Sequence, residues 1–287
     1  MRRSCSHVFA AGALAAILLA CGDSTAPDDD PLPDNAATAV GLTVRDNAEA
    51  SLDAFFPARL LQPFSTGPAD DPCVTPSSSA ETDGDGVPDD ATYTFTAPPC
   101  RYTDVRGFSL DVVGQLRIAD PVPDTAGFGA NLTLTALRFS LSADDPDQNY
   151  SVIRNGTMTL TGTPAGLELA TDIQVQRTFT GLLDASAEHV WTVGFDPETS
   201  LQINQPLPNG SVTVSGTVGW TRGNENFDLT ITTATPLHYD ASCEATGQRF
   251  DDGELRVSGT FGETPGYVRI VWEDCGQDPG IEFVAEE

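Results

Sequence analysis

The sequence contains no lysine, and its cationic side chains are 14 arginines set against 42 aspartates and glutamates. The formal net charge at pH 7 is therefore −28. Proteins bind nucleic acid largely by neutralising its phosphates with Lys and Arg, so a surface this acidic repels them. We therefore expect no nucleic-acid partner, whereas high solubility and binding of divalent cations are compatible with the charge.

Common catalytic signatures are also absent from the sequence. It contains no G-x-S-x-G, H-E-x-x-H or G-x-x-x-x-G-K-[ST] motif, so no catalytic residue is assigned. Of the three histidines, His189 shares the apolar phase of its predicted strand and is expected in the core, whereas His238 falls on the polar phase. Trp191, Trp220 and Trp272 lie on apolar phases, which favours core packing over sugar binding.

Long hydrophobic runs are scarce, and the clearest one lies at the N-terminus. Arg2 and Arg3 precede an apolar run over residues 8–20, which is short for a membrane span of roughly 20 residues. A positive start followed by such a run is typical of a secretory signal peptide. We therefore expect residues 1–20 to be a leader.

Residues 18–21, Leu-Leu-Ala-Cys, resemble the lipobox of bacterial lipoproteins. The resemblance implies cleavage before Cys21, a diacylglycerol on its thiol and acylation of its freed amine. Two or three acyl chains anchor a protein stably, at about 0.8 kcal/mol per buried methylene. Gly22, rather than Asp, follows the cysteine, which favours the outer membrane, facing the periplasm or the surface. Loss of the leader takes the net charge from −28 to −30, because residues 1–20 hold two arginines and no acid.

The sequence contains six cysteines, which limit the covalent links that the chain can form. Cys5 leaves with the leader and Cys21 carries the lipid. The remaining four are Cys73, Cys100, Cys243 and Cys275. An even number in an oxidising compartment predicts disulfides, and we favour Cys73–Cys100 and Cys243–Cys275 because each pair closes a short loop. The other two pairings stay open, whereas a four-thiolate zinc site is disfavoured by the lack of any C-x-x-C pair.

Apolar and polar residues alternate along most of the chain from Tyr93 onward, which is the pattern of half-buried strands. The clearest runs lie in 167–175, 212–220, 227–231 and 255–261. They predict an all-β fold, a large antiparallel meander of about 10–12 strands with one short N-terminal helix. The sheet is expected to be a curved open sheet, a sandwich or a barrel.

Several features locate turns and irregularities in these strands. The phase slips between Leu134 and Leu137, which predicts a bulge. Asn-Gly pairs at 155–156 and 209–210 predict turns. A short repeat of the form Gly, alternating apolar residues, then Gly-Thr recurs at 156–163, 210–217 and 253–260. We interpret the copies as equivalent strands that start at a turn and bend at the second glycine.

The domain organisation follows from these patterns. Residues 21–40 are rich in Asp and Pro and are predicted to form a flexible tether. Residues 41–287 form a single β-rich domain, with a helical segment in 41–64 and a disulfide-pinned acidic loop in 73–100. Asp46 or Asn47 is expected to cap the helix and Pro57 to end it at Phe56. Its apolar face is expected to cover the sheet.

The best candidate for a metal site is the acidic loop 81–90, Glu-Thr-Asp-Gly-Asp-Gly-Val-Pro-Asp-Asp. It resembles the calcium loops of EF-hand-like and thrombospondin type 3 repeats, with Gly86 at the sharp turn. The implied Ca²⁺ ligands are Glu81, Asp83, Asp85, Asp89 and Asp90 through carboxylates and Val87 through its carbonyl. The loop departs from the pattern by its first ligand, a Glu rather than Asp, and by Thr92 at the twelfth position. The alternative is a solvated acidic loop; any Ca²⁺ here is expected to be structural.

Together these features favour a membrane-anchored, exported lipoprotein that acts as a non-enzymatic binding or structural module of the cell envelope. An apolar ligand or an envelope protein is the expected partner, besides the membrane that holds the lipid. Lipoprotein carriers with half-barrels and helical lids are similar in layout alone. Two alternatives remain, an envelope polymer hydrolase with a carboxylate pair and a calcium-dependent surface attachment protein.

Overall fold

The computed structural model describes residues 32–55, 74–77, 80–103, 109–142, 150–179, 185–203, 205–246, 249–275 and 277–286. One helix, α1 (Leu32–Ala54), precedes twelve strands, and a 3-10 helix, η3 (Ala241–Thr246), follows the ninth. The strands are β1 (Val74–Pro76), β2 (Asp90–Thr103), β3 (Ser109–Ala119), β4 (Ala130–Ser142), β5 (Tyr150–Thr163), β6 (Gly166–Phe179), β7 (Ala185–Pro197), β8 (Gly210–Arg222), β9 (Glu225–Tyr239), β10 (Phe250–Phe261), β11 (Thr264–Trp272) and β12 (Gly280–Ala285).

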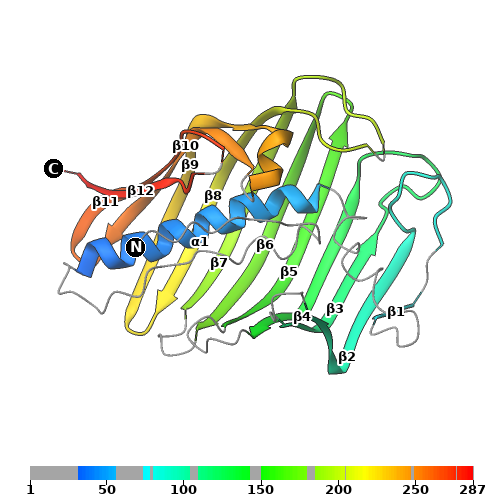
Figure 1. Cartoon of the computed structure of the whole chain (residues 1–287), viewed down its shortest axis with the longest axis horizontal. Coiled ribbons are helices and arrows are strands. Elements are labelled where there is room, and N and C mark those ends of the chain that lie inside the picture. Colours follow the sequence, from blue (N-terminus) through cyan, green and yellow to red (C-terminus); the bar gives the residue numbers. More distant parts are fainter. Residues whose placement is uncertain are drawn as a thin grey trace.

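The strands form one antiparallel sheet whose spatial order is the sequence order, from β1 at one edge to β12 at the other. The predicted all-β meander is therefore confirmed, and of the three arrangements considered the sheet adopts the open one. It curves so that β10–β12 wrap over α1, which lies across the face of the sheet (Figure 1).

Alternation of side chains gives the sheet its apolar face. In β9, Phe227, Leu229 and Ile231 are buried while the residues between them are exposed. The same phase buries Trp220 and Trp272, each 1% exposed, and Trp191. Because successive strand residues point to opposite faces, this alternation turns the apolar residues toward α1 and the core. The core placement predicted for the three tryptophans is confirmed.

The predicted bulge is present where the phase slips. The register between β4 and β5 shifts between Leu134 and Leu137, and Ala136 adopts a positive φ of 46°. The Ala136 amide donates to Asn155 Oδ1 at 2.6 Å. The Asn155-Gly156 turn prediction was wrong, because both residues lie inside β5. Gly156 has φ 136°, so its conformational freedom serves an irregularity within the sheet instead of a hairpin.

The three repeat copies are not equivalent in the fold. Only the copy at Gly210 starts its strand at the first glycine, and its second glycine, Gly216, has φ 147° next to a register shift between β8 and β9. In β5 and β10 the first glycines, Gly156 and Gly253, lie within the strands and have positive φ themselves. The shared pattern therefore reflects the alternation that any strand of this sheet requires.

Helix α1 begins earlier than the sequence predicted. It starts at Leu32 instead of at Asp46 or Asn47, so residues 32–40 belong to the helix and not to a tether. The buried side chains recur every four residues, at Ala36, Val40, Val44, Ala48 and Leu52, which is one helix face. Pro33 is compatible with a first helical turn, where its missing N–H costs no hydrogen bond.

The helix ends at Ala54, two residues before the predicted end, and Pro57 lies outside the described residues. Among the described residues, no helix combines the length and the apolar character that crossing a bilayer requires.

The helix packs closely because it presents a glycine to the sheet. A Cβ atom on Gly41 would lie 2.5 Å from Ile281 Cγ2 and 3.1 Å from Val268 Cγ1, so a side chain at this position would force Ile281 to shift. Farther along the helix, the Phe55 and Phe195 ring centroids lie 6.0 Å apart. The buried face of α1 and the sheet form one hydrophobic core.

Candidate metal centre

The acidic loop predicted from the sequence leads into β2, and strand pairing places it next to a second loop. Asp90, the first residue of β2, pairs with Ala119, the last residue of β3. The loop that enters β2 and the loop that leaves β3 therefore meet at the same end of the sheet. The Asp120 amide bonds to the carbonyls of Pro88 and Asp89, at 3.0 and 3.2 Å, and joins the two loops.

Three of the predicted ligands come together in this loop. Carboxylate oxygens of Glu81, Asp83 and Asp85 lie within 4.8 Å of one another. Amides of the loop hold them: Asp85 N donates to Asp83 Oδ1 at 3.1 Å, and Gly86 N donates to Glu81 Oε1 at 2.6 Å. Gly86 has φ 90°, which explains a glycine at the sharp turn. Such a cluster of hard oxygen donors suits Ca²⁺ in kind.

The other predicted ligands have different partners. Asp89 closes the loop, because Oδ1 accepts the Thr82 amide at 2.9 Å and Oδ2 accepts the Thr82 hydroxyl at 2.7 Å. Asp90 forms a two-pronged ion pair with Arg117, with both contacts at 2.8 Å, and this hydrogen bonding lowers the pKa of Asp90. Val87 is buried and donates its amide to Asp85 Oδ1 at 2.8 Å. Neither Asp89 nor Asp90 joins the carboxylate cluster.

Asp85 is the most buried member of the cluster, at 7% exposed. Burial raises its pKa, backbone hydrogen bonds from Val87 and Gly127 lower it, and the charges of Asp83 and Asp120 raise it again. The Gly127 amide, in the loop after β3, donates to Asp85 Oδ2 at 3.1 Å. The centre thus draws on both loops.

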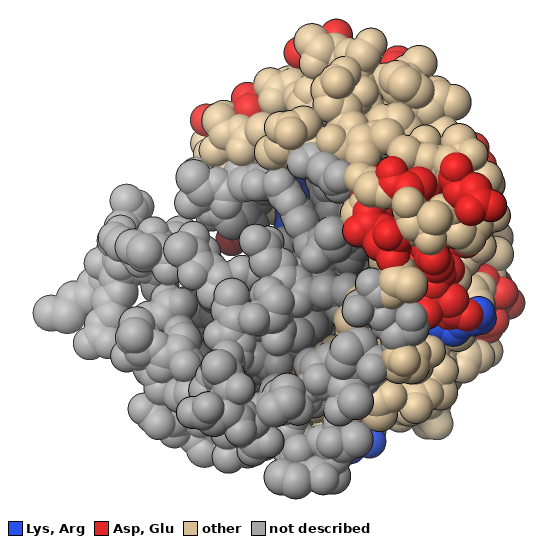
Figure 2. Space-filling view, turned by 90° about the vertical axis from the view of Figure 1, so that its right-hand side faces the viewer, with Lys and Arg blue, Asp and Glu red and all other residues tan. Residues whose placement is uncertain are grey.

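Asp120 was not predicted from the sequence, because it lies outside the acidic motif. The signal that would have found it is the hairpin: once β2 and β3 pair, the residue after β3 must lie beside the residue before β2. Figure 2 views the molecule from its β1–β2 side. Acidic side chains gather on the described part of the surface seen in this view.

His238 lies on the polar face, as predicted, but it is not a lone histidine. Its Nδ1 lies 2.6 Å from Asp251 Oδ1 and its Nε2 lies 3.2 Å from Glu198 Oε1. The hydrogen bond with Asp251 raises the pKa of His238, burial lowers it, and Glu198 raises it further. The imidazole therefore joins β9 to β10 and to the end of β7.

His189 lies in the core, as predicted. It is 2% exposed, and its ring centroid lies 4.8 Å from that of Trp191.

Cys243 and Cys275 form a disulfide, with Cα atoms 5.1 Å apart, as predicted. Asp240 and Asp251 lie beside this disulfide, but sulfur atoms bonded to each other are not thiolate ligands. Cys21 and Cys73, and the side chain of Cys100, lie outside the described part of the structure, so the lipid anchor and the first disulfide stay predictions.

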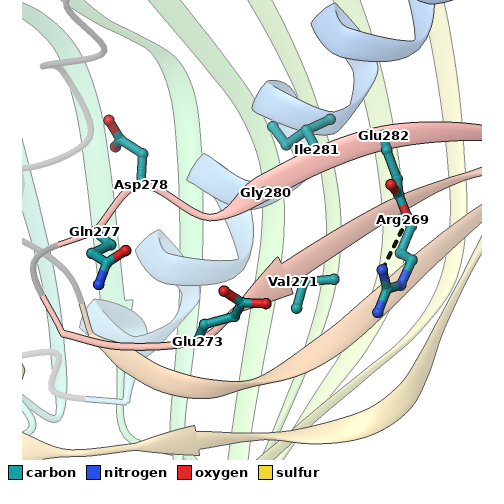
Figure 3. Close-up of a pocket in the computed structure, with 8 residues that line it drawn as sticks. All are labelled: Arg269, Val271, Glu273, Gln277, Asp278, Gly280, Ile281 and Glu282. Atoms are coloured by element: carbon teal, nitrogen blue, oxygen red, sulfur yellow. Dashed lines mark hydrogen bonds and ion pairs between the residues drawn. The ribbon is translucent and has the colours of Figure 1, made fainter.

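A pocket of about 330 Å³ lies where β11 and β12 approach their connecting loop (Figure 3). Eight residues line it: Arg269, Val271, Glu273, Gln277, Asp278, Gly280, Ile281 and Glu282. Arg269 donates to Glu282 at 2.9 Å and to Glu254 at 2.8 Å. Because its guanidinium is already shared between strands, we interpret this pocket as part of a cross-strand ion-pair network.

No protein-family model, no curated protein and no solved structure matches this chain.

Proposed function

We propose that the chain is an exported lipoprotein, anchored through Cys21 to a bacterial membrane, and that its β domain is a non-enzymatic structural or protein-binding module of the cell envelope. The position of α1 supports the second part of this proposal, that the β domain is a structural or protein-binding module. The anchor rests on the leader and the Leu-Leu-Ala-Cys sequence at residues 18–21.

Helix α1 occupies the place where a carrier of this layout would hold an apolar ligand. Val40, Val44, Ala48 and Leu52 are 0% exposed and belong to the same core as the strands. Gly41 brings the helix backbone against β11 and β12. Removing the helix to admit a ligand would expose this apolar face to water, at about 25 cal/mol for each Å². This favours a packed module over a lipid carrier.

Hydrogen bonds also fix α1 to the sheet. Asn47 contacts His189 in β7 at 2.9 Å, and Trp272 in β11 donates to Glu49 at 3.4 Å. A lid that opens for a ligand would have to break both contacts in a buried setting, where unpaired polar groups are costly. The acidic outer surface, by contrast, is available to a partner protein.

Native mass spectrometry of the whole chain, exported with its own leader and extracted in detergent, tests whether the β domain is a packed module or a lipid carrier. We expect the acylated polypeptide without a further organic ligand. A lipid-sized mass that is lost on denaturation would contradict the packed module and support the carrier, because an acyl chain on Cys21 is covalent and stays. The anchor is tested separately by fractionation: the wild-type chain should sediment with membranes, and Cys21→Ala should not.

A further inference from the structure

Two carboxylate oxygens beside the acidic loop are buried without a hydrogen-bond partner among the described residues, Oδ2 of Asp83 and Oδ2 of Asp120. Asp120 is 8% exposed. Its other oxygen, Oδ1, accepts the Val122 amide at 2.7 Å, so the side chain is held firmly with one oxygen unused. A buried carboxylate oxygen without a partner is destabilising unless a hydrogen-bond donor, a bound proton or a cation lies against it.

Asp83 belongs to the carboxylate cluster with Glu81 and Asp85. Asp120 lies outside that cluster, in the adjoining loop that its amide ties to Pro88 and Asp89, and its charge acts on Asp85. No arginine among the described residues forms an ion pair with any of these four carboxylates. The carboxylates of Glu81, Asp83 and Asp85 lie close enough to repel one another, and a cation between them would relieve that repulsion.

We propose that Glu81, Asp83, Asp85 and Asp120 bind one divalent cation, with Ca²⁺ the ion that fits best. The donors are all oxygens, and neither a histidine nor a free thiol belongs to the cluster, which disfavours Zn²⁺. Two loops supply the ligands, and loop-borne carboxylates suit the flexible coordination of Ca²⁺ better than the strict octahedron of Mg²⁺.

The proposed ion would close one end of the sheet. Glu81, Asp83 and Asp85 precede β2, whereas Asp120 follows β3, so one cation would tie together the entrance and the exit of this hairpin. Asp120 is what distinguishes this site from a self-contained acidic loop. The proposal is independent of the anchor and of any protein partner.

Calorimetric titration of the metal-stripped full chain with CaCl₂ and with MgCl₂ tests the site. Asp120→Asn keeps the Oδ1 acceptor for the Val122 amide and replaces only the unpartnered oxygen. We expect it to weaken Ca²⁺ binding by about tenfold or more, because affinity follows the number of charged ligands. Asp124→Asn, an exposed residue of the same loop, is the matched control and should bind like the wild type.

Thermal unfolding in chelator and in Ca²⁺ separates a ligand from a structural side chain. If Asp120 is a ligand, Asp120→Asn should unfold at the same or a higher temperature than the wild type in chelator, because one repulsive charge is gone, and should gain less from Ca²⁺. Asp83→Asn should behave likewise. Wild-type protein without a binding signal at millimolar Ca²⁺, or Asp120→Asn with unchanged affinity, would overturn the proposal.

Discussion

Asn47 Nδ2, on the buried face of α1, donates a hydrogen bond to His189 Nε2 of β7 at 2.9 Å. The two residues are 7% and 2% exposed. The acceptor role of Nε2 requires the neutral imidazole. A polar contact across an otherwise apolar interface fixes the position of the helix, since sliding the helix would break this hydrogen bond in a buried setting.

Asn47→Ala should therefore destabilise the protein, although alanine is the better helix former. We expect a loss of about 1–3 kcal/mol in the free energy of unfolding, the cost of a buried group without its partner. Urea denaturation measures it. His189→Phe and the double variant complete a cycle, and the double variant should lose less than the sum of the single ones. Strictly additive losses would show that the pair is not coupled.

The Glu49 carboxyl of α1 makes the stability of the protein depend on pH. Burial raises the pKa of Glu49 to about 7, while Trp272, Arg45 and Arg249 lower it and Asp46 raises it. The folded state therefore holds a proton that the unfolded state releases above the ordinary glutamate pKa of 4.5. Stability should fall as pH rises from about 4.5 to about 7, by roughly 3 kcal/mol in total.

Glu49→Gln should remove this dependence and be more stable than the wild type at neutral pH and above. Glu188→Gln, an exposed residue of β7, is the control and should keep the wild-type profile. Unfolding curves across this pH range provide the measurement. A Glu49→Gln profile parallel to that of the wild type would contradict the buried, protonated carboxyl.

The close packing at Gly41 predicts an unusual penalty for added side-chain volume. Gly41→Val would drive methyl groups into Ile281 and Val268, and we expect a loss of about 1–3 kcal/mol, typical of overpacking. Thermal unfolding measures this loss, and Ile281→Ala should partly rescue Gly41→Val.

Thr38→Val is the control for the Gly41 substitution, because it introduces the same side chain at an exposed position of α1. Threonine and valine have similar size and similar helix propensity, so we expect almost no change in stability. A loss in Thr38→Val as large as that in Gly41→Val would indicate that valine in this helix, rather than the contact with Ile281, is responsible.

His238 predicts a pH dependence of its own, with the same sign as that of Glu49. Because its pKa is raised in the folded state, the contribution of its ion pairs is present below the unfolded pKa of 6.5 and lost as pH rises through the folded value. His238→Gln should destabilise the protein under acidic conditions and have little effect above that range. The loss should stay below about 1 kcal/mol, since the site is partly exposed. Asp251→Asn should reproduce it; a pH-independent loss would count against the ion pair.

Much of the fold was predictable because apolar and polar side chains alternate along each half-buried strand. The phase of Leu167 to Phe261 predicted the buried face, and the slip between Leu134 and Leu137 predicted the bulge. Local rules failed where tertiary packing decides. The Asn155-Gly156 pair has turn chemistry, yet it serves a bulge, because its partner strand continues past it on both sides.

The start of α1 was missed for a related reason. Its buried residues include small ones, Ala36 and Ala48, which give a weak apolar signal, and the adjacent acidic and proline-rich stretch suggested a tether. In the candidate site, the motif predicted Glu81, Asp83 and Asp85 correctly as neighbours. It did not reveal Asp120, whose place depends on the pairing of β2 with β3, nor that Arg117 binds Asp90.

Because α1 begins at Leu32, only a short segment separates the helix from the proposed lipid anchor at Cys21. Between an acylated Cys21 and the first helical residue lie residues 22–31, which span at most about 35 Å when fully extended. The N-terminal end of α1 lies at the side of the molecule that carries β11 and β12 (Figure 1). The attachment point of a lipid-anchored molecule would therefore lie nearer the β12 edge of the sheet than the β1–β2 edge, where the acidic loop lies.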